Sequence, residues 1–167
     1  MDFDAAFERL IGHEGVLSMD PQDRGNWTGG ERDKGRLLGS KYGISAASYP
    51  GEDIAGLTLE RARELYKRDY WGPAGCDAVP DPIKFDLFDM AVNSGKGAAV
   101  RALQKAAGAA VDGILGPRTL AAVQAMPPAR LLARFNGARL AFMADAPTWP
   151  AHGRGWARRI ASNLLEA

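Results

Sequence analysis

One glutamate, Glu14, stands in the sequence where a single acid can do chemistry. It comes at the end of a stretch with helical apolar spacing, directly before a glycine and a polar loop. The negative end of a helix macrodipole and partial burial both disfavour a charged carboxylate, so we expect a raised pKa for Glu14. A protonated carboxyl group is what glycosidic bond hydrolysis requires of its general acid. The alternative is that Glu14 is an ordinary helix-end residue in solvent.

The loop after Glu14, over residues 16–40, holds the candidate partners of that acid. Asp23 could position water or stabilise a cationic transition state, whereas Asp20, followed by proline, is typical of turn chemistry. An Asp-rich turn would also explain both residues. Trp27 either offers a platform to a ligand or fixes the loop to the body of the protein. Loops of this length without periodicity usually have a function or move.

Helices must position these side chains, and apolar residues three and four positions apart predict most of them. The first helix should run from residue 2 or 4 to residue 14, and Thr58 should cap another that extends to the pair Tyr70 and Trp71. Strand signals are few, so the fold class should be mostly α, with one small β-hairpin within residues 16–45. Further helices are expected to begin near residues 45–47 and to cover 81–94, 98–108, 116–125, 128–146 and 155–165.

Two groups of residues could form the walls of a cleft. Tyr70 and Trp71 either stack on sugar rings or pack into the core at a helix end. Asp86, Asp89 and Asn93 are spaced by three and seven positions, so they share one face of the 81–94 helix. That face either flanks a cleft or is solvated.

The charge of the chain gives no strong case for nucleic acid as a partner. The 167 residues carry a net charge of +1, although the part after residue 126 holds six arginines against Asp145 and Glu166. This basic C-terminal region could contact an anionic envelope, or it could be a solvated helix face.

Several other classes of site are poorly supported. The lone Cys76 excludes an intramolecular disulfide bond, and His13, His152 and Cys76 lack the spacing of metal ligands. We therefore expect no metal and no cofactor. The N-terminus is acidic where a signal peptide needs basic residues, and no apolar run approaches the ~18 residues of a membrane helix. Synthesis in the cytoplasm without an export signal is the expectation.

A series of motifs, in order, resembles glycoside hydrolase family 108, the lysozyme-like N-acetylmuramidases that include many phage endolysins. The first half of the chain carries His13-Glu14-Gly15, Asp20-Pro21-x-Asp23, Tyr42-Gly43-Ile44-Ser45, Arg68-Asp69-Tyr70-Trp71 and Asp89-Met90-Ala91-Val92-Asn93-Ser94-Gly95. The second half is similar to the predicted peptidoglycan-binding domain that usually follows, through Leu103-Gln104-x3-Gly108, Asp112-Gly113-x2-Gly116-Pro117-x-Thr119 and Gly153-Arg154-Gly155-Trp156.

The resemblance implies that Glu14 is the catalytic acid and that the Tyr42–Ser45 segment and Asn93 line a sugar groove. It also implies cleavage of the β-1,4 bond between N-acetylmuramic acid and N-acetylglucosamine. The chain departs from the family in Val16-Leu17, where glycine and tyrosine are usual, and in a longer loop between Asp23 and Tyr42. The second departure bears on the partners of Glu14.

These observations together predict an endolysin-type muramidase with a lysozyme-like helical fold. Residues 1–95 should form the catalytic region, with residues 96–167 packed on it as a helical peptidoglycan-binding part. Glu14 would be the acid, with Asp23 or Ser45 orienting water. Substrate contacts are predicted for Tyr42, Gly43, Tyr70, Trp71, Asp89 and Asn93. The enzyme should be a monomer, made in the host bacterial cytoplasm and acting on the cell wall after release.

Two other functions remain open at this point. A lytic transglycosylase would act on the same bond with one glutamate but would release 1,6-anhydromuramic ends. A non-catalytic module would bind the cell wall, with Glu14 an ordinary residue of the cleft. The loop carboxylates favour hydrolysis, because a transglycosylase has no water to position.

Overall fold

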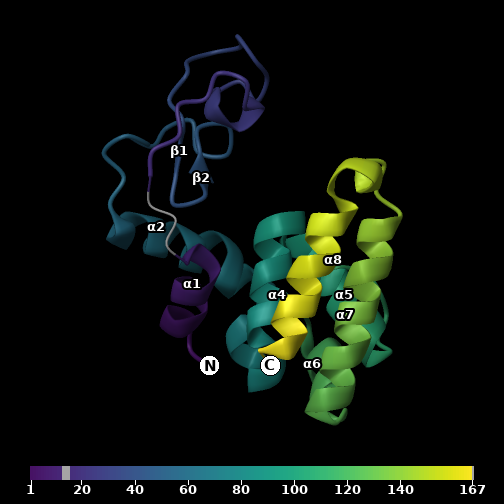
Figure 1. The fold of residues 1–167 in the computed structure, drawn as a ribbon. Helices are drawn as coiled ribbons and strands as arrows, with labels where there is room; N and C mark the ends of the chain where they lie inside the picture. Colours follow the sequence, from purple (N-terminus) through teal and green to yellow (C-terminus); the bar gives the residue numbers. More distant parts are fainter. Residues whose placement is uncertain (13–15, 167) are drawn as a thin grey trace. The chain divides into compact units, whose positions relative to one another are not determined.

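The computed structural model describes residues 1–12 and 16–166 (Figure 1). Two compact units make up the chain, Phe7–Lys67 and Met1–Ala6 with Arg68–Ala167. We call the first the hairpin unit and the second the helical unit, and each is described by itself. The predicted boundary between residues 95 and 96 falls inside the helical unit, where the helix before it packs against the helix after it.

The fold is mostly α-helical, as predicted, and its described sheet is one small antiparallel hairpin. Helix α1, Phe3–Ile11, begins after Asp2, whose Oδ1 accepts a hydrogen bond from the Ala5 amide at 2.9 Å. It ends at Ile11 because Gly12 adopts a left-handed conformation with φ of 56°. The sequence predicted a helix that continues to Glu14, which itself lies outside the described residues.

The hairpin unit is built around strands β1, Ser40–Lys41, and β2, Ile44–Ser45, which pair within the predicted region (Figure 1). Isolated β-bridges pair Ser18 with Ser40 and Trp27 with Leu37. The short 3-10 helix η1, Arg24–Asn26, lies between Ser18 and Trp27 in sequence. The helix expected to begin near residues 45–47 is absent there. Ser45 belongs to the strand, and the chain makes turns until Pro50.

Helix α2, Leu59–Tyr66, closes the hairpin unit. Thr58 caps it as predicted, because its hydroxyl oxygen accepts a hydrogen bond from the Arg61 amide at 3.1 Å. Its buried face consists of Ala62, Leu65 and Tyr66. The Tyr66 ring meets Phe7 of α1 edge to face, with centroids 5.6 Å apart.

After α2, the described part of the helical unit passes through three short helical elements and then five longer helices. Its elements are η2 (Lys67–Trp71, a π-helix), α3 (Gly72–Ala74), η3 (Cys76–Ala78), α4 (Asp81–Ser94), α5 (Lys96–Ala107), α6 (Pro117–Gln124), α7 (Pro128–Ala144) and α8 (Trp149–Leu165). In the described part of the chain, no helix is both long and apolar enough to cross a bilayer.

Helix α4 lies in the core of the helical unit. Residues on all its sides from Phe85 to Ala91 are buried, which is typical of a helix surrounded by others. Helix α7 packs against α4, α5 and α8 (Figure 1). The predicted helices over 81–94, 98–108, 116–125 and 128–146 are all present, with ends that differ by one or two residues.

The last helix starts six residues before the predicted residue 155. Gly153 and Gly155 argue against a helix by propensity, but Gly153 is buried under the indole of Trp149. A Cβ atom at Gly153 would lie 2.5 Å from the Trp149 ring, so glycine lets this side chain fold onto its own helix. Tertiary packing here overrides helix propensity.

Candidate functional site

Asp23 and Asp20 are fixed by hydrogen bonds within the loop of the hairpin unit. The Oδ1 atom of Asp23 accepts a hydrogen bond from the Gly25 amide at 2.8 Å and caps η1. The Oδ1 atom of Asp20 accepts one from the Gln22 amide at 2.8 Å, which is the turn chemistry predicted for it. Both side chains are exposed, and a second carboxylate oxygen of Asp23 remains for another contact.

Asn26 holds this loop together from the inside. It is fully buried, and its side-chain amide donates a hydrogen bond to the Asp20 carbonyl oxygen at 2.9 Å. The backbone carbonyl oxygen of Asn26 accepts hydrogen bonds from the backbone amides of Leu38 and Gly39. Trp27 donates its indole N–H to the Pro21 carbonyl oxygen at 3.0 Å, so it fixes the loop to itself.

The structure brings two of the predicted catalytic residues, Asp23 and Ser45, close to the same face of one glycine, Gly25. A Cβ atom at Gly25 would lie 3.2 Å from the Asp23 carboxylate and 3.6 Å from the Ser45 Cβ atom. The Gly25 carbonyl oxygen accepts a hydrogen bond from the Ala47 amide, which ties η1 to the end of β2. The Ser45 hydroxyl lies 3.2 Å from the hydroxyl of Ser48.

Tyr42 and Gly43 form the two-residue turn of the hairpin. Both have positive φ, 52° and 73°, the conformation that a tight hairpin turn requires. The Tyr66 hydroxyl donates to the Tyr42 carbonyl oxygen at 3.1 Å, and a Cβ atom at Gly43 would lie only 2.4 Å from that hydroxyl. Helix α2 therefore sets the position of the turn, with Ser45 beside it in β2.

Trp71 and Tyr70 belong to the helical unit. Trp71 is 1% exposed, packs edge to face against Phe3 and Phe88, and donates its indole N–H to Asp77 at 2.9 Å. Of the two roles considered for Trp71, packing into the core is the one found in this structure. Its ring offers no open face to a sugar. Tyr70 is half-buried within the π-helix η2, a geometry that is frequent at functional sites.

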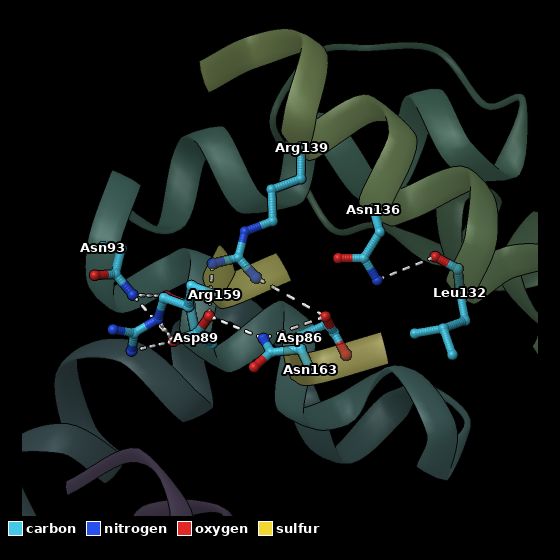
Figure 2. Close-up of polar contacts among 8 residues, drawn as sticks. All are labelled: Asp86, Asp89, Asn93, Leu132, Asn136, Arg139, Arg159 and Asn163. Atoms are coloured by element: carbon cyan, nitrogen blue, oxygen red, sulfur yellow. Dashed lines mark hydrogen bonds and ion pairs between the residues drawn. The ribbon is translucent and has the colours of Figure 1, made fainter. Parts of the chain in front are cut away.

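Asp89 lies at the centre of a buried polar cluster that joins α4, α7 and α8 (Figure 2). Its Oδ2 accepts hydrogen bonds from Arg139 at 2.5 Å and Asn163 at 3.1 Å. Its Oδ1 accepts bonds from Arg159 at 2.5 and 2.8 Å and from Asn93 at 3.0 Å. With both oxygens occupied and none of its surface exposed, the carboxylate of Asp89 holds helices together and does not face a groove.

The two buried carboxyl groups of this cluster differ in pKa. Burial would raise the pKa of Asp89, but the hydrogen bonds of Arg159 and the charge of Arg139 outweigh it and lower the pKa. Burial raises the pKa of Asp86. The positive charge of Arg139, 3.8 Å away, lowers it again only in part. Asp89 is thus held as the anion that balances the arginines.

Asn93 keeps one part of its side chain in the cluster and borders a pocket with the rest. Its amide nitrogen donates to the backbone oxygen of Asp89 at 2.7 Å as well as to the carboxylate. The residue is exposed and lines a pocket of about 190 Å³ with Phe142, Met143 and Trp156. Asn93 is thus a predicted substrate contact in the helical unit that lies beside an open pocket.

Three partners of Asp89 were not predicted from the sequence, namely Arg139, Arg159 and Asn163. A signal for Arg139 existed, because it lies four positions from both Phe135 and Met143 on the buried stripe of α7. A charged residue on such a stripe requires a buried counter-charge. Arg159 and Asn163 are likewise four positions apart on α8.

Residues 7–95 match the model of a protein family described as Glycosyl hydrolase 108, more than half of the chain. The chain belongs to this family. Residues 98–161 match a second model, described as a predicted peptidoglycan domain. The two matches meet close to the predicted boundary between residues 95 and 96 and support a glycoside hydrolase that acts on peptidoglycan.

A solved structure shares this architecture over nearly the whole chain. It is titled "Structure of Brucella abortus SagA", and the two superpose with a TM-score of 0.81 and 28% sequence identity. The likeness covers 98% of this chain and 92% of that one. No curated protein matches the chain.

In the predicted peptidoglycan domain, the motif around Asp112 proves to be a loop organised by one buried glutamine. Gln104 donates to the Asp112 carboxylate at 2.7 Å and to the Ile114 carbonyl oxygen at 3.0 Å, and it accepts the Gly113 amide at 2.8 Å. Hydrogen bonds from the Ile114 amide and from Gln104 lower the pKa of Asp112. These residues shape the turn between α5 and α6.

Among the residues that the structure describes, neither unit offers an evident metal centre. Across residues 1–12 and 16–166, no three His, Cys, Asp or Glu side chains gather as metal ligands would. The thiol of Cys76 is buried, and burial raises its pKa to about 12, so it is no nucleophile at neutral pH.

Proposed function

We propose that this glycosyl hydrolase 108 family member is an N-acetylmuramidase, which hydrolyses the β-1,4 bond between N-acetylmuramic acid and N-acetylglucosamine in peptidoglycan. The observation that carries the proposal is the family match over residues 7–95, which includes Glu14, Asp23, Ser45 and Asn93. The match of residues 98–161 to a predicted peptidoglycan domain supports the choice of substrate.

In the proposed reaction, Glu14 donates a proton to the glycosidic oxygen as the C1–O bond of N-acetylmuramic acid breaks. A water molecule adds to C1, and the proton that it releases returns Glu14 to its acid form, so a new reducing end forms. Asp23 supplies the negative charge that positions this water or stabilises the cationic carbon, and Ser45, which also lies beside Gly25, offers the water a hydrogen bond. Asn93 contacts a sugar substituent.

The test is product analysis on purified peptidoglycan with the parent protein and the Glu14→Gln variant. We expect the parent to release reducing muramic acid ends, and the variant to lose at least about 100-fold in rate because its amide cannot donate the proton. Glu8→Gln is the matched control, an exposed glutamate of α1, and should act at the parent rate.

Two outcomes would overturn the proposal. Release of 1,6-anhydromuramic ends alone would show a lytic transglycosylase. A Glu14→Gln variant that digests peptidoglycan at the parent rate would remove Glu14 from the chemistry and favour the non-catalytic wall-binding module.

The resemblance to phage endolysins supports a further part of the proposal, that the enzyme is made in the bacterial cytoplasm and reaches the wall after release. The chain expressed in a bacterial host should leave the culture turbid until the membrane is permeabilised, and should then clear it. Clearing without permeabilisation, measured by optical density, would contradict this route. Glu14→Gln under the same conditions separates wall hydrolysis from toxicity.

A further inference from the structure

A groove runs along the seam of α5 and α7 in the helical unit and is unused by the proposed reaction. One part is a pocket of about 220 Å³ with a floor of small residues, among them Ala102, Ala138 and Ala141. Its walls are Val111 and Phe142, which are 54% and 48% exposed. Exposed apolar side chains gathered around a hollow are typical of a binding surface.

The groove continues past Lys105 into a second pocket of about 320 Å³, which shares Lys105, Ala138 and Ala141 with the first. Gly137 lies in this second pocket, and a Cβ atom there would meet nothing within 4 Å. The floor is therefore open and shallow along nearly three turns of α7. It suits a ligand that is extended and carries small side chains.

Cationic groups stand along one side of the groove. Arg101 and Lys105 lie on its α5 side, and Arg134 lies at its far end, where its guanidinium donates to the Ala106 carbonyl oxygen at 2.5 Å. Gly113 leaves room for the Arg101 side chain, because a Cβ atom at Gly113 would lie 2.6 Å from its guanidinium. Within residues 1–12 and 16–166, no carboxylate forms an ion pair with Arg101 or Lys105.

One anionic group stands opposite these cations. Asp145 borders the first pocket at the C-terminal end of α7, where the helix macrodipole also favours a positive charge. The groove thus presents two or three sites for carboxylates and one site for an amine, separated by a floor that accepts methyl groups.

We propose that this groove binds the stem peptide of peptidoglycan. A stem peptide is a short chain that begins and ends in alanine, and the two residues between them, a glutamate and a diamino acid, supply a free carboxylate and an amine. Its charges complement Arg101, Lys105 and Asp145, and its methyl groups fit the alanine floor. The glycan fits less well, because the lining residues of the two pockets include no tryptophan, tyrosine or amide side chain.

This inference rests on the proposed action on peptidoglycan and adds that the α5–α7 groove recognises the peptide while the sugar bond is cleaved elsewhere. It lies inside the region that matches a predicted peptidoglycan domain. Binding at the groove would keep the enzyme on cross-linked wall material between cleavage events.

The test is titration of the full chain with a soluble, purified stem peptide that carries a diamino acid. We expect saturable binding by the parent and a loss on the order of tenfold in affinity for Arg101→Ala, which removes a charged hydrogen-bond donor. Ala141→Leu should weaken binding as strongly by filling the floor. The matched controls are Arg118→Ala and Ala144→Leu, exposed residues of α6 and α7 outside both pockets, and should bind as the parent does.

Acetylation of the side-chain amine of the peptide tests the role of Asp145. It should weaken binding to the parent but change little for Asp145→Asn, which has already lost the charge. Equal weakening of both would remove Asp145 from the site and overturn the predicted orientation of the peptide.

The inference fails if the parent does not bind the peptide, or if the groove variants bind it like the controls. A parent that self-associates through this groove in place of binding peptide, seen as a dimer that Ala141→Leu dissociates, would also overturn it. Hydrolysis of glycan strands stripped of stem peptides separates this result from the proposed function. The groove variants should cleave such strands at the parent rate, whereas Glu14→Gln should not.

Discussion

Asp89 shows how a correct sequence pattern led to a different role. The spacing of Asp86, Asp89 and Asn93 placed them on one helix face, and Figure 2 shows them together on α4. Periodicity reports which residues share a face but not what covers that face. The cover is α7 and α8, whose arginines come 50 and 70 residues after Asp89. Local spacing carries no information on such partners.

The first prediction concerns this buried ion cluster. Asp89→Asn leaves Arg139 buried without its counter-charge, so we expect a loss of about 3–5 kcal/mol in the free energy of unfolding. Asp86→Asn is the matched control on the same helix. Because burial raises the pKa of Asp86, its charge is weakly stabilised, and its replacement should change stability by less than about 1 kcal/mol. Urea unfolding followed by circular dichroism measures both, and equal losses would contradict the assignment.

The second prediction separates the capping role of Asp23 from a catalytic one. Asparagine caps a helix about as well as aspartate, so Asp23→Asn should keep η1 and the melting temperature. If the charge of Asp23 supports the reaction, kcat on peptidoglycan should fall by about 10²-fold or more. Asp20→Asn preserves its turn in the same way and should retain parent activity. An active, stable Asp23→Asn variant would leave Asp23 with capping alone.

At the scale of elements, the sequence predicted most helices because their apolar spacing and caps are local features. Thr58, the apolar spacing within α4 and the left-handed Gly108 after α5 all act within one or two turns. The boundaries that were predicted wrongly also have physical causes. Gly12 ends α1 early, Ser45 pairs as a strand where a helix was expected to begin, and Gly153 permits a helix because Trp149 covers it.

The candidate site was predictable to a smaller extent. Motif order pointed to Asp23, Ser45 and the Tyr42–Gly43 turn, but their arrangement around Gly25 depends on how the long loop folds back on the hairpin. Trp71 was proposed as a sugar platform and is buried between Phe3 and Phe88, since its spacing alone could not distinguish a groove from a core. For Glu14, support now comes from family membership, because α1 ends at Ile11 and Glu14 lies outside the described residues.

The third prediction tests how α2 sets the hairpin. Gly43→Ala must place a side chain at φ of 73° and bring a Cβ atom to 2.4 Å from the Tyr66 hydroxyl. We expect a loss of about 1–3 kcal/mol in stability together with reduced activity. Adding Tyr66→Phe should restore part of the loss by removing the clashing oxygen. Gly51→Ala, whose Cβ atom would meet nothing within 4 Å, is the control in a differential scanning measurement.

At the scale of the whole molecule, the basic C-terminal region has much of its charge committed internally. Arg139 is fully buried, Arg159 binds Asp89, and Arg134 binds carbonyl oxygens at the end of α5. A count of charges along the sequence therefore overstates what this region can offer to an anionic envelope. Any such contact depends on the remaining arginines, Arg130, Arg154 and Arg158.

The fourth prediction is a dependence of stability on pH. The lowered pKa of Asp89 stabilises the folded chain above about pH 4, and this contribution is lost as pH falls and the unfolded chain takes up the proton first. The raised pKa of Asp86 acts in the opposite direction, since the folded chain then takes up the proton first. In urea titrations from pH 7 to pH 3, the difference in the free energy of unfolding between the parent and Asp89→Asn should become smaller. A difference that stays constant over this pH range would contradict a contribution of the Asp89 pKa to stability.

The Arg159–Asp89 contact also has a consequence for the time at which the molecule matures. Asp89 is synthesised 70 residues before Arg159, which at typical elongation rates is about 3.5 to 14 seconds. During that interval α4 carries an acidic group with no cation from α8 to accompany it into the interior. The helical unit therefore cannot reach its final packing on the nascent chain until α8 has emerged. Chains arrested before Trp149 should remain open to proteolysis at α4, and chains arrested well past Leu165 should resist it.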